Sequence, residues 1–290
     1  MLSLHIKSKE LRHSYIILII CAALLAGCSS TKFMPENKYL LDRVEIKSDT
    51  KGFDAALLAP YVRQKANSKW FNFFKIPLAT YSLAGRDSTK WINRTLQKMG
   101  EKPVAYDTLQ AQLSCNDLRA ALQNMGYMHA SVSLKTSVKG RKLKATYTLH
   151  PGLPYYISTY RTSIADDTIR QILQPQLKSL EGHRFTVDEL EAERKRIANI
   201  LLNEGYYKFH KDFIQFEADS AKGSHNIAVT MQLMNYITGD NKLPKPHPRY
   251  RIANVFFLGS DSDKIHLRHH VLEQNAAIRQ GQFYSNADLR

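Results

Sequence analysis

Two stretches of the chain alternate apolar and polar residues on either side of a short turn, which is the pattern of a β-hairpin. The first runs from Met128 to Leu149 around the turn Lys139-Gly140-Arg141. The second runs from Tyr207 to Leu233 around a turn at 221–224, and its first strand is less regular. The alternating apolar positions are Met128, Ala130, Val132, Leu134, Leu143, Ala145, Tyr147 and Leu149 in the first, and Ile227, Val229, Met231 and Leu233 in the second.

A helix with one apolar face is predicted before each hairpin. Each helix ends at a Gly-Tyr pair, Gly126-Tyr127 and Gly205-Tyr206, where the glycine suits a left-handed C-cap. Thr186 is the expected N-cap of the second helix, with Glu189 closing a capping box. For the first helix we expect Ser114 as the cap, with Asp117 at the third position. The expected hydrophobic staples are Leu113 with Leu118 and Phe185 with Leu190.

A third pattern occurs three times along the chain, twice before the helix and hairpin described above. The segments LLDRVEI, YISTYRT and RIANVFF place apolar residues at an offset of three and then two, which breaks strict alternation and predicts a β-bulge. Short helices are expected after them, over 56–65, 167–174 and 265–274. Pro60 and Pro175 should shorten or kink the first two.

The order strand, helix, helix, strand, strand therefore recurs, and the fold class is α+β. We place a signal peptide at 1–27, a tether at 28–38, and a first repeat at 39–151 with an insertion at about 70–106. The second repeat occupies 152–236, and a Pro-rich linker occupies 237–248. Residues 249–290 begin a third repeat that is incomplete, because its last segment, QGQFYSNADLR, matches the helix start EGHRFTVDELE of the second repeat.

The N-terminus carries an export signal. A basic stretch precedes an apolar run from Tyr15 to Leu25, which is short for a membrane span and suits a signal peptide. The run ends in Leu25-Ala26-Gly27-Cys28, the form of a bacterial lipobox recognised by signal peptidase, with Cys28 as the acylated residue. An ordinary cleaved signal or an uncleaved anchor is the alternative. Ser29 after the cysteine favours the outer membrane by resemblance to lipoprotein sorting rules.

The charge of the chain is strongly basic, at +15. Export removes nucleic acid as a partner, so an anionic lipid surface or an acidic protein remains. An ordinary solvated basic face explains the charge equally well.

The insertion contains an aromatic cluster, Trp70, Phe71, Phe73 and Phe74, flanked by Lys69 and Lys75. Core packing of an enlarged first repeat is the preferred interpretation. Contact with a membrane surface is the alternative, because aromatic residues beside lysines suit the lipid interface.

The sequence patterns that could indicate catalysis or metal binding are incomplete. His266 and His270 would share one face of a helix with Glu273, but this ligand set is partial, and solvated histidines explain it better. The pair Asp166-Asp167 is better explained by helix capping. Cys115 would have a lowered pKa if it lay in the first turn of its helix, although a buried or tolerated thiol is the favoured interpretation. We therefore predict no catalysis, no metal and no cofactor other than the lipid on Cys28.

Several short motifs stand in a particular order along the mature chain. They are the lipobox at Cys28, Lys38-Tyr39-Leu40-Leu41, Gln64-Lys65-Ala66-Asn67, Gly100-Glu101-Lys102-Pro103-Val104 and the run from Tyr147 to Ile157. With the tandem repeats, they resemble the POTRA units of the BamA/TamA outer-membrane assembly superfamily, and more closely the lipidated TamA-like proteins (TamL) of Bacteroidota. Relatives often have proline where this chain has Ala66.

The resemblance implies a periplasmic POTRA arm, anchored in the outer membrane by lipid, that takes part in outer-membrane protein assembly or translocation. Such proteins end in a membrane barrel, and we place none within residues 1–290. The implied partners are unfolded outer-membrane protein clients and a TamB-like protein that crosses the periplasm. A lipid-anchored periplasmic scaffold without a barrel is the alternative.

The first strand of each hairpin should lie at a sheet edge, where an extended partner segment adds by main-chain hydrogen bonds. The alternative is that neighbouring repeats cover these edges. The expected edge segments are 128–135 and 207–216, with Met128, Ala130, Val132, Leu134, Phe209 and Phe213 as the expected partner-binding residues.

Overall fold

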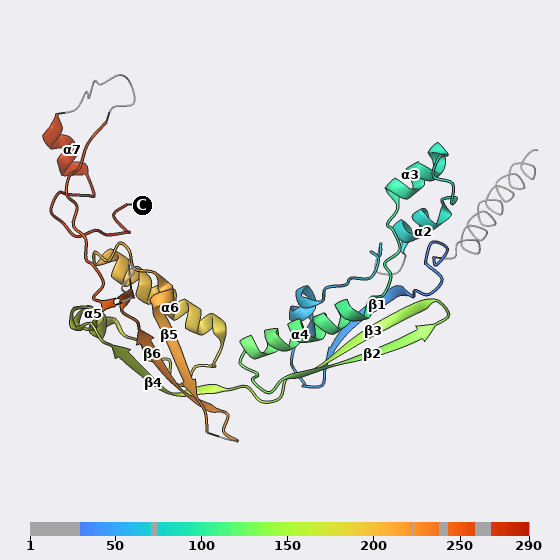
Figure 1. Ribbon diagram of the computed structural model, residues 1–290, viewed down its shortest axis with the longest axis horizontal. Coiled ribbons are helices and arrows are strands. Elements are labelled where there is room, and N and C mark those ends of the chain that lie inside the picture. The colour runs from blue at the N-terminus through green and yellow to red at the C-terminus, as the bar shows by residue number, and fades with distance from the viewer. Residues whose placement is uncertain (1–29, 71–74, 222, 238–242, 259–267, 290) are drawn as a thin grey trace, which may run out of the picture. The chain divides into compact units, whose positions relative to one another are not determined.

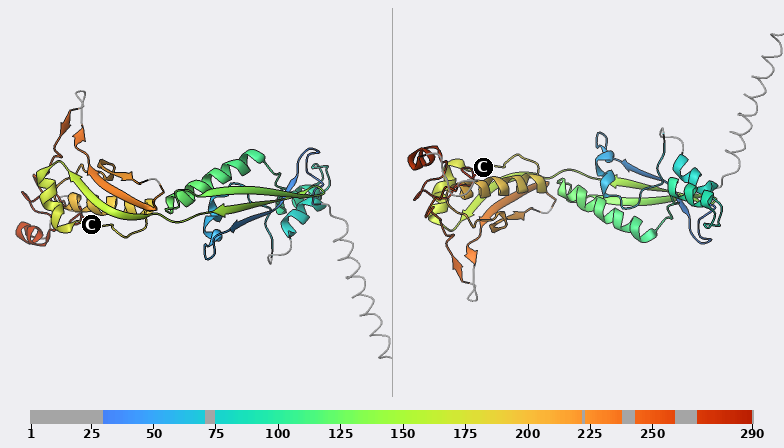
Figure 2. Two further views of the ribbon diagram at one scale, coloured as in Figure 1. Left: turned by 90° about the horizontal axis from the view of Figure 1, so that it is seen from below. Right: turned by 90° about the horizontal axis from the view of Figure 1, so that it is seen from above.

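The computed structural model describes residues 30–70, 75–221, 223–237, 243–258 and 268–289, shown as coloured ribbon in Figure 1 and from two further sides in Figure 2. The chain forms two compact units. Unit 1 comprises the residues up to 121 together with 130–151, and unit 2 comprises 122–129 and the residues from 152 onward. Each unit contains one three-stranded sheet with helices, so the fold is α+β as predicted.

The sheet of unit 1 consists of β1 (Leu40–Ser48), β2 (Ser131–Lys139) and β3 (Lys142–His150), in the order β1-β3-β2. The pairing of β1 with β3 is parallel, and that of β2 with β3 is antiparallel. The register shifts between Leu41 and Arg43, which confirms the predicted bulge. The extra residue, Asp42, accepts a hydrogen bond from Lys75 Nζ at 2.9 Å.

The sheet of unit 2 repeats this topology with β4 (Tyr156–Ile164), β5 (Ile214–Asp219) and β6 (Asn226–Leu233), in the order β4-β6-β5. A register shift between Ile157 and Thr159 is the equivalent bulge. Both predicted hairpins are therefore confirmed. The strand expected from Tyr207 begins only at Ile214, because residues 211–213 turn as a short 3-10 helix, η3 (Lys211–Phe213).

The first helix of each repeat is short, as the prolines predict. η1 (Ala55–Tyr61) is a 3-10 helix that contains Pro60 and ends before the expected Lys65. α5 (Asp167–Leu173) gives way to a 3-10 turn, η2 (Gln174–Gln176), at Pro175. Asp166 caps α5 by accepting hydrogen bonds from the backbone N–H groups of Thr168 (2.9 Å) and Ile169 (3.1 Å), which confirms its capping role.

The start of α4 (Thr108–Asn124) differs from the prediction. Asp107 is the cap, because its Oδ1 accepts hydrogen bonds from the backbone N–H groups of Leu109 (2.8 Å) and Gln110 (3.2 Å). Ser114 is fully buried inside the helix and donates to the Gln110 carbonyl at 2.8 Å, so it is not a cap. The staple of Leu113 with Leu118 at that cap is also wrong. Asp107 followed by Gln110 is the same signature, placed earlier in the chain.

The start of α6 (Val187–Asn203) is as predicted, since Thr186 Oγ1 accepts from the Glu189 N–H at 3.2 Å. The Glu189 carboxylate does not close the capping box, because it bonds His183 Nδ1 at 2.8 Å. The glycines after α4 and α6 have φ of +90° at Gly126 and +99° at Gly205, which confirms both left-handed C-caps.

The core of unit 2 lies between α5, α6 and the sheet. Buried residues of both helices, including Ile169, Ile197 and Leu201, form one cluster with Met231 of β6. A second cluster gathers Tyr155, Ile157, Leu180, Ile227 and Val229 near the start of the sheet, and Phe185 and Leu190 pack against it.

The insertion of the first repeat forms a helical hairpin, in which α2 (Ile76–Leu83) packs against α3 (Trp91–Met99). Leu78 of α2 is buried with Met34 and Leu40. Trp70 is 55% exposed, and Phe71, Phe73 and Phe74 lie outside the described residues. Among the described helices, none combines the length and apolar character that crossing a membrane requires.

The third repeat lacks its expected strand. Ile252–Phe257 pairs with no strand in the part of the chain that the structure describes, whereas the equivalent strands β1 and β4 pair with the last strand of their own hairpins. What forms is an isolated bridge between Arg251 and Phe283 and a short helix, α7 (His269–Asn275). The linker forms a two-residue pairing of β7 (Tyr236–Ile237) with β8 (Pro244–Lys245).

Candidate functional site: the free strand edges

The edge of β2 is open among the described residues, because β2 pairs with β3 and with no other described strand. Lys139 and Lys142 face each other across a two-residue turn in which Gly140 has φ +59°. In such a hairpin the two residues next to the turn, here Lys139 and Lys142, bond each other through both their N–H and C=O groups. Farther along the strand, the main-chain groups of successive residues point alternately away from the partner strand and toward it. The main-chain groups of Thr136 and Val138 therefore point away from β3, and those of Ser137 point toward it.

The outer half of β2 is open on both faces as well as along its edge. Its residues 135–139 are all exposed, and Val138 is 49% exposed. Val132 and Leu134 are half-buried on the inner half. Lys135 and Lys139 make the strand basic, and lysines on an edge strand also hinder uncontrolled pairing with other sheets.

Two of the predicted residues near this edge lie elsewhere. Ala130 is buried and precedes β2. Met128 packs against the second core cluster of unit 2, beside Tyr155. Of the four residues predicted here, only Val132 and Leu134 lie on the edge strand.

The edge of β5 is shorter and acidic. β5 pairs with β6 alone among the described strands, and its exposed residues include Glu217 and Asp219. Glu217 accepts a hydrogen bond from Gln232 Nε2 at 2.7 Å. Phe209 is buried and Phe213 lies in η3, so neither of these predicted residues belongs to the edge.

Phe209 and Phe213 instead hold the linker through His247. The His247 ring centroid lies 4.9 Å from that of Phe209 and 4.7 Å from that of Phe213. His247 Nε2 bonds the Met234 carbonyl at 2.8 Å. Burial lowers the pKa of His247, so the imidazole is neutral at pH 7. The sequence signal for this cluster was only a histidine between two prolines, which did not reveal it.

A chain of hydrogen bonds joins the ends of the three strands of unit 1. Ser133 Oγ lies 2.9 Å from His150 Nε2, and His150 Nδ1 lies 2.6 Å from Asp49 Oδ2. The hydrogen bond from His150 lowers the pKa of Asp49. This order of groups is that of a hydrolase triad, but a triad also needs oxyanion donors and a binding pocket. We interpret the chain of hydrogen bonds as a tie between strands, because it links Ser133 of β2 and His150 of β3 to Asp49, the residue after β1.

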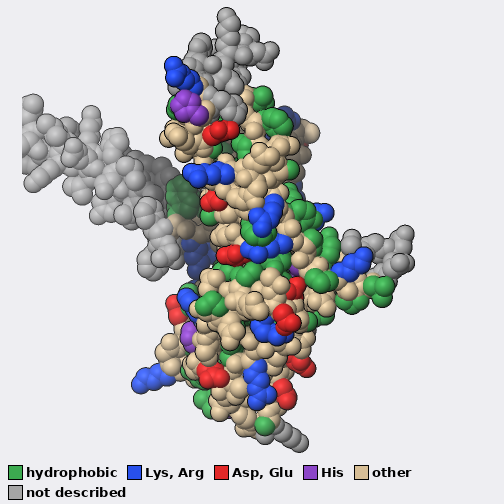
Figure 3. All heavy atoms as spheres, turned by 90° about the vertical axis from the view of Figure 1, so that its left-hand side faces the viewer, with side chains coloured by type: hydrophobic (Ala, Val, Ile, Leu, Met, Phe, Trp, Pro, Cys, Tyr) green, Lys and Arg blue, Asp and Glu red, His purple; other side chains and the backbone are tan. Residues whose placement is uncertain are grey.

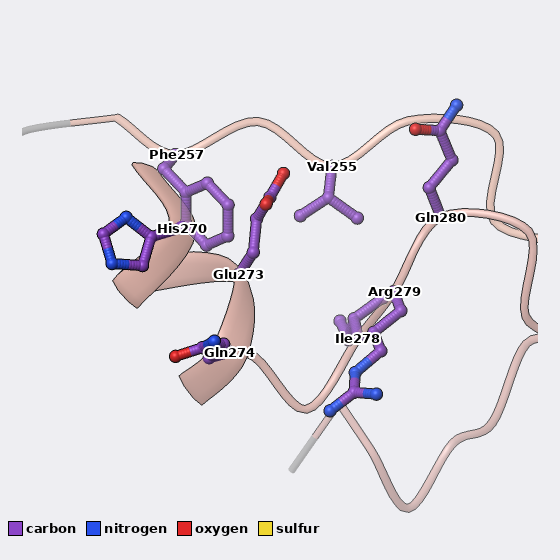
Figure 4. Close-up of a pocket in the computed structure, with 8 residues that line it drawn as sticks. All are labelled: Val255, Phe257, His270, Glu273, Gln274, Ile278, Arg279 and Gln280. Carbon is purple, nitrogen blue, oxygen red and sulfur yellow. The ribbon is translucent and has the colours of Figure 1, made fainter. Parts of the chain in front are cut away.

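Two of the cavities in the described part of the chain are lined by several apolar side chains. One, of about 390 Å³, lies in the third repeat, where Val255, Phe257 and Ile278 meet the polar side chains of His270 and Glu273 (Figure 4). The other, of about 380 Å³, lies along β1 and is lined by Val44, Ile46, Val62, Asn67 and others between residues 42 and 69.

Two alternatives weighed in the sequence, a metal site and a reactive thiol, concern residues of the third repeat and of α4. Among the described residues no three metal-ligating side chains come together. His266 lies outside the described residues, and His270 is exposed. Cys115 lies inside α4 rather than in its first turn, and burial raises the pKa of its thiol, so a lowered pKa is wrong for this cysteine.

The basic charge is not concentrated on the face shown in Figure 3, where Lys and Arg side chains lie among Asp and Glu. Several cations of the described residues are paired with carboxylates, such as Arg249 Nη2 with Glu204 Oε2 at 3.1 Å. This arrangement is that of a mixed, solvated surface.

The chain is similar in structure to several known proteins. No family model matches the sequence, and no curated protein matches it. Haemophilus influenzae BamA POTRA3-5 has a TM-score of 0.39 at 13% identity, covering 89% of this chain and 85% of that one. POTRA1-3 of Omp85 from Anabaena has a TM-score of 0.33 at 9% identity, covering 88% and 82%. CdiB from Escherichia coli has a TM-score of 0.27 at 12% identity, covering 81% and 36%.

Proposed function

We propose that this chain is a periplasmic POTRA arm of an outer-membrane assembly or translocation protein, held at the outer membrane by a lipid on Cys28. Its task is to dock extended segments of unfolded clients or of a partner protein, with a TamB-like protein as the partner that the sequence resemblance suggests.

The observation that carries the proposal is the edge of β2, which pairs with β3 alone among the described strands, in a repeated β-α-α-β-β unit. An added strand needs main-chain N–H and C=O groups that face away from the sheet, and Thr136 and Val138 supply them. Backbone pairing accepts many sequences, which suits a protein that handles varied clients. The edge of β5 offers a second, shorter site of opposite charge, with Glu217 and Asp219 where β2 has Lys135 and Lys139.

The second candidate is a lipid-anchored scaffold that binds partners without belonging to an insertase. The free edges serve such a scaffold equally well. The two proposals differ in whether a membrane barrel belongs to the same polypeptide, so the coding sequence downstream of codon 290 separates them.

A pair of proline variants tests the docking edge. Thr136→Pro removes an N–H that faces away from β3, and the ring obstructs an incoming strand. We expect it to weaken binding of a urea-denatured outer-membrane β-barrel protein, freshly diluted into buffer, by about tenfold, which corresponds to about 1.4 kcal/mol. A photo-crosslinking residue in place of Lys135 reports the binding.

The control is Thr136→Ala, which keeps the N–H and should bind as the original chain does. Ser137→Pro removes an N–H that faces β3, so it should lower the stability of the sheet itself. Undiminished crosslinking in a folded Thr136→Pro variant would rule out strand addition at β2.

A further inference from the structure

The helix α3 has an exposed face that no described segment covers. None of its residues is buried, although the helix is strongly amphipathic. Trp91 is 74% exposed, Met99 is 72% exposed and Ile92 is 53% exposed. An exposed tryptophan beside two other large apolar side chains on so short a helix is unusual for a surface that meets only water.

The exposed face consists of two adjoining stripes, because residues four apart lie above one another on a helix. Lys90, Arg94 and Lys98 form a basic stripe that starts at the N-cap. Trp91 and Met99 lie on the neighbouring stripe, with Ile92 beside them. α3 contains no acidic residue. Its half-buried residues are Asn93, Leu96 and Gln97, and Asn93 and Gln97 bond the chain around Gly85.

The hairpin of α2 and α3 is fastened to the chain just after Cys28. Lys32 Nζ donates to the Ala84 carbonyl at 2.8 Å. The rings of Phe33 and Tyr81 meet edge to face, with centroids 5.2 Å apart. Lys32 is the fourth residue after Cys28, and an extended chain over those four steps spans at most about 14 Å. Wherever a lipid holds Cys28 in a bilayer, the hairpin must therefore lie close to the headgroups.

We propose that α3 docks on an anionic phospholipid surface, with Trp91, Ile92 and Met99 in the interface and Lys90, Arg94 and Lys98 against the headgroups. This inference rests on the lipid anchor of the proposed function. Aromatic and basic side chains in adjoining stripes are the composition of helices that lie in the membrane interface. The lipid attaches the chain to the membrane, and α3 provides a second contact that sets the orientation of unit 1 relative to the membrane surface.

The test uses the full, lipidated chain in vesicles of phosphatidylcholine, with and without phosphatidylglycerol, whose acyl chains carry bromine. The sequence has two tryptophans, so Trp70→Phe leaves Trp91 as the sole reporter. We expect bromine to quench Trp91 fluorescence and the emission to shift to shorter wavelength. The effect should be stronger with phosphatidylglycerol and weaker in high salt.

Charge variants test the basic stripe. Lys90→Glu together with Lys98→Glu should abolish the part of the quenching that depends on phosphatidylglycerol. The matched control is Lys178→Glu together with Lys195→Glu, which changes the net charge equally at exposed positions of unit 2 and should leave the quenching unchanged.

Three results would overturn the inference. The first is that bromine does not quench Trp91 in the anchored protein and its emission is unshifted. The second is a blue shift without quenching, which means that another protein covers Trp91. The third is an equal loss of quenching in both pairs of charge variants. Mass spectrometry of Cys28 and flotation of the vesicles report the anchor separately. If Cys28 carries no lipid, the anchor of the proposed function fails, and docking by α3 is judged by quenching on adding the same vesicles to the protein.

Discussion

Gly205 shows how a single residue joins the second repeat to the start of the third. Its carbonyl accepts a hydrogen bond from the Tyr250 N–H at 2.7 Å. A Cβ on Gly205 would lie 2.9 Å from Arg249 Cγ and 3.1 Å from Phe283 Cδ1. Gly126 is used in the same way, since its carbonyl accepts from the Tyr155 N–H at 2.9 Å. The Gly-Tyr pairs thus provide a helix end and also a close approach to the next segment.

We predict that Gly205→Ala destabilises this joint. The positive φ costs about 1 kcal/mol for a residue with a Cβ, and the displaced Arg249 and Phe283 add to it. Hydrogen exchange of the Tyr250 amide should become faster by at least about fivefold.

The matched control for this prediction is Gly223→Ala, where φ is +80° but no atom lies within 4 Å of the added Cβ. It should strain its own turn and leave exchange at Tyr250 unchanged. If both variants affected Tyr250 equally, close packing at Gly205 would not be the cause.

At the scale of elements, local signals predicted some features and missed others. The bulges in β1 and β4, the two hairpins and the Thr186 cap were predictable, because each depends on neighbouring residues in the sequence. The start of α4 was misplaced because Asp107 and Ser114 both carry cap signatures, and only burial of Ser114 distinguishes them.

The attachment of the linker should depend on pH through His247. Its pKa is lowered in the folded protein from an ordinary value of 6.5, so the folded form binds the proton more weakly than the detached form does. The contribution of neutral His247 to the attachment of the linker is therefore complete above pH 6.5 and decreases as the pH falls below that value. Phe209, Phe213 and Tyr236 pack around the ring, and Asp166 is the carboxylate that opposes the lowering of the His247 pKa.

Hydrogen exchange at the Tyr236 amide measures this attachment, because Tyr236 pairs with Lys245 of β8. We expect slow exchange, corrected for the intrinsic effect of pH, at pH 8 and faster exchange at pH 5. His247→Phe keeps the ring packing and should remove the pH dependence. A pH dependence that persists in His247→Phe would assign it to another group.

At the scale of the whole molecule, the proposed function requires that Cys28 carry the lipid that anchors the protein. Cys28→Ala should abolish incorporation of labelled palmitate and remove the protein from the outer-membrane fraction. The matched control is Cys21→Ala, which changes a cysteine inside the predicted signal peptide and should leave both properties intact. A Cys28→Ala variant that still fractionated with the outer membrane would disprove the lipid anchor.

The sequence by itself determined the order of elements in the first two repeats and their glycine helix ends, because these depend on spacings within a few residues. On the same kind of local pattern it predicts an export signal at the N-terminus. Only the tertiary structure decided which residues meet across the chain. It moved Phe209 and Phe213 from an expected edge to the His247 cluster, joined Ser133 to His150 and Asp49, and left Trp91 exposed beside a basic stripe. Burial and pairing between distant segments produce these features, and no local pattern encodes them.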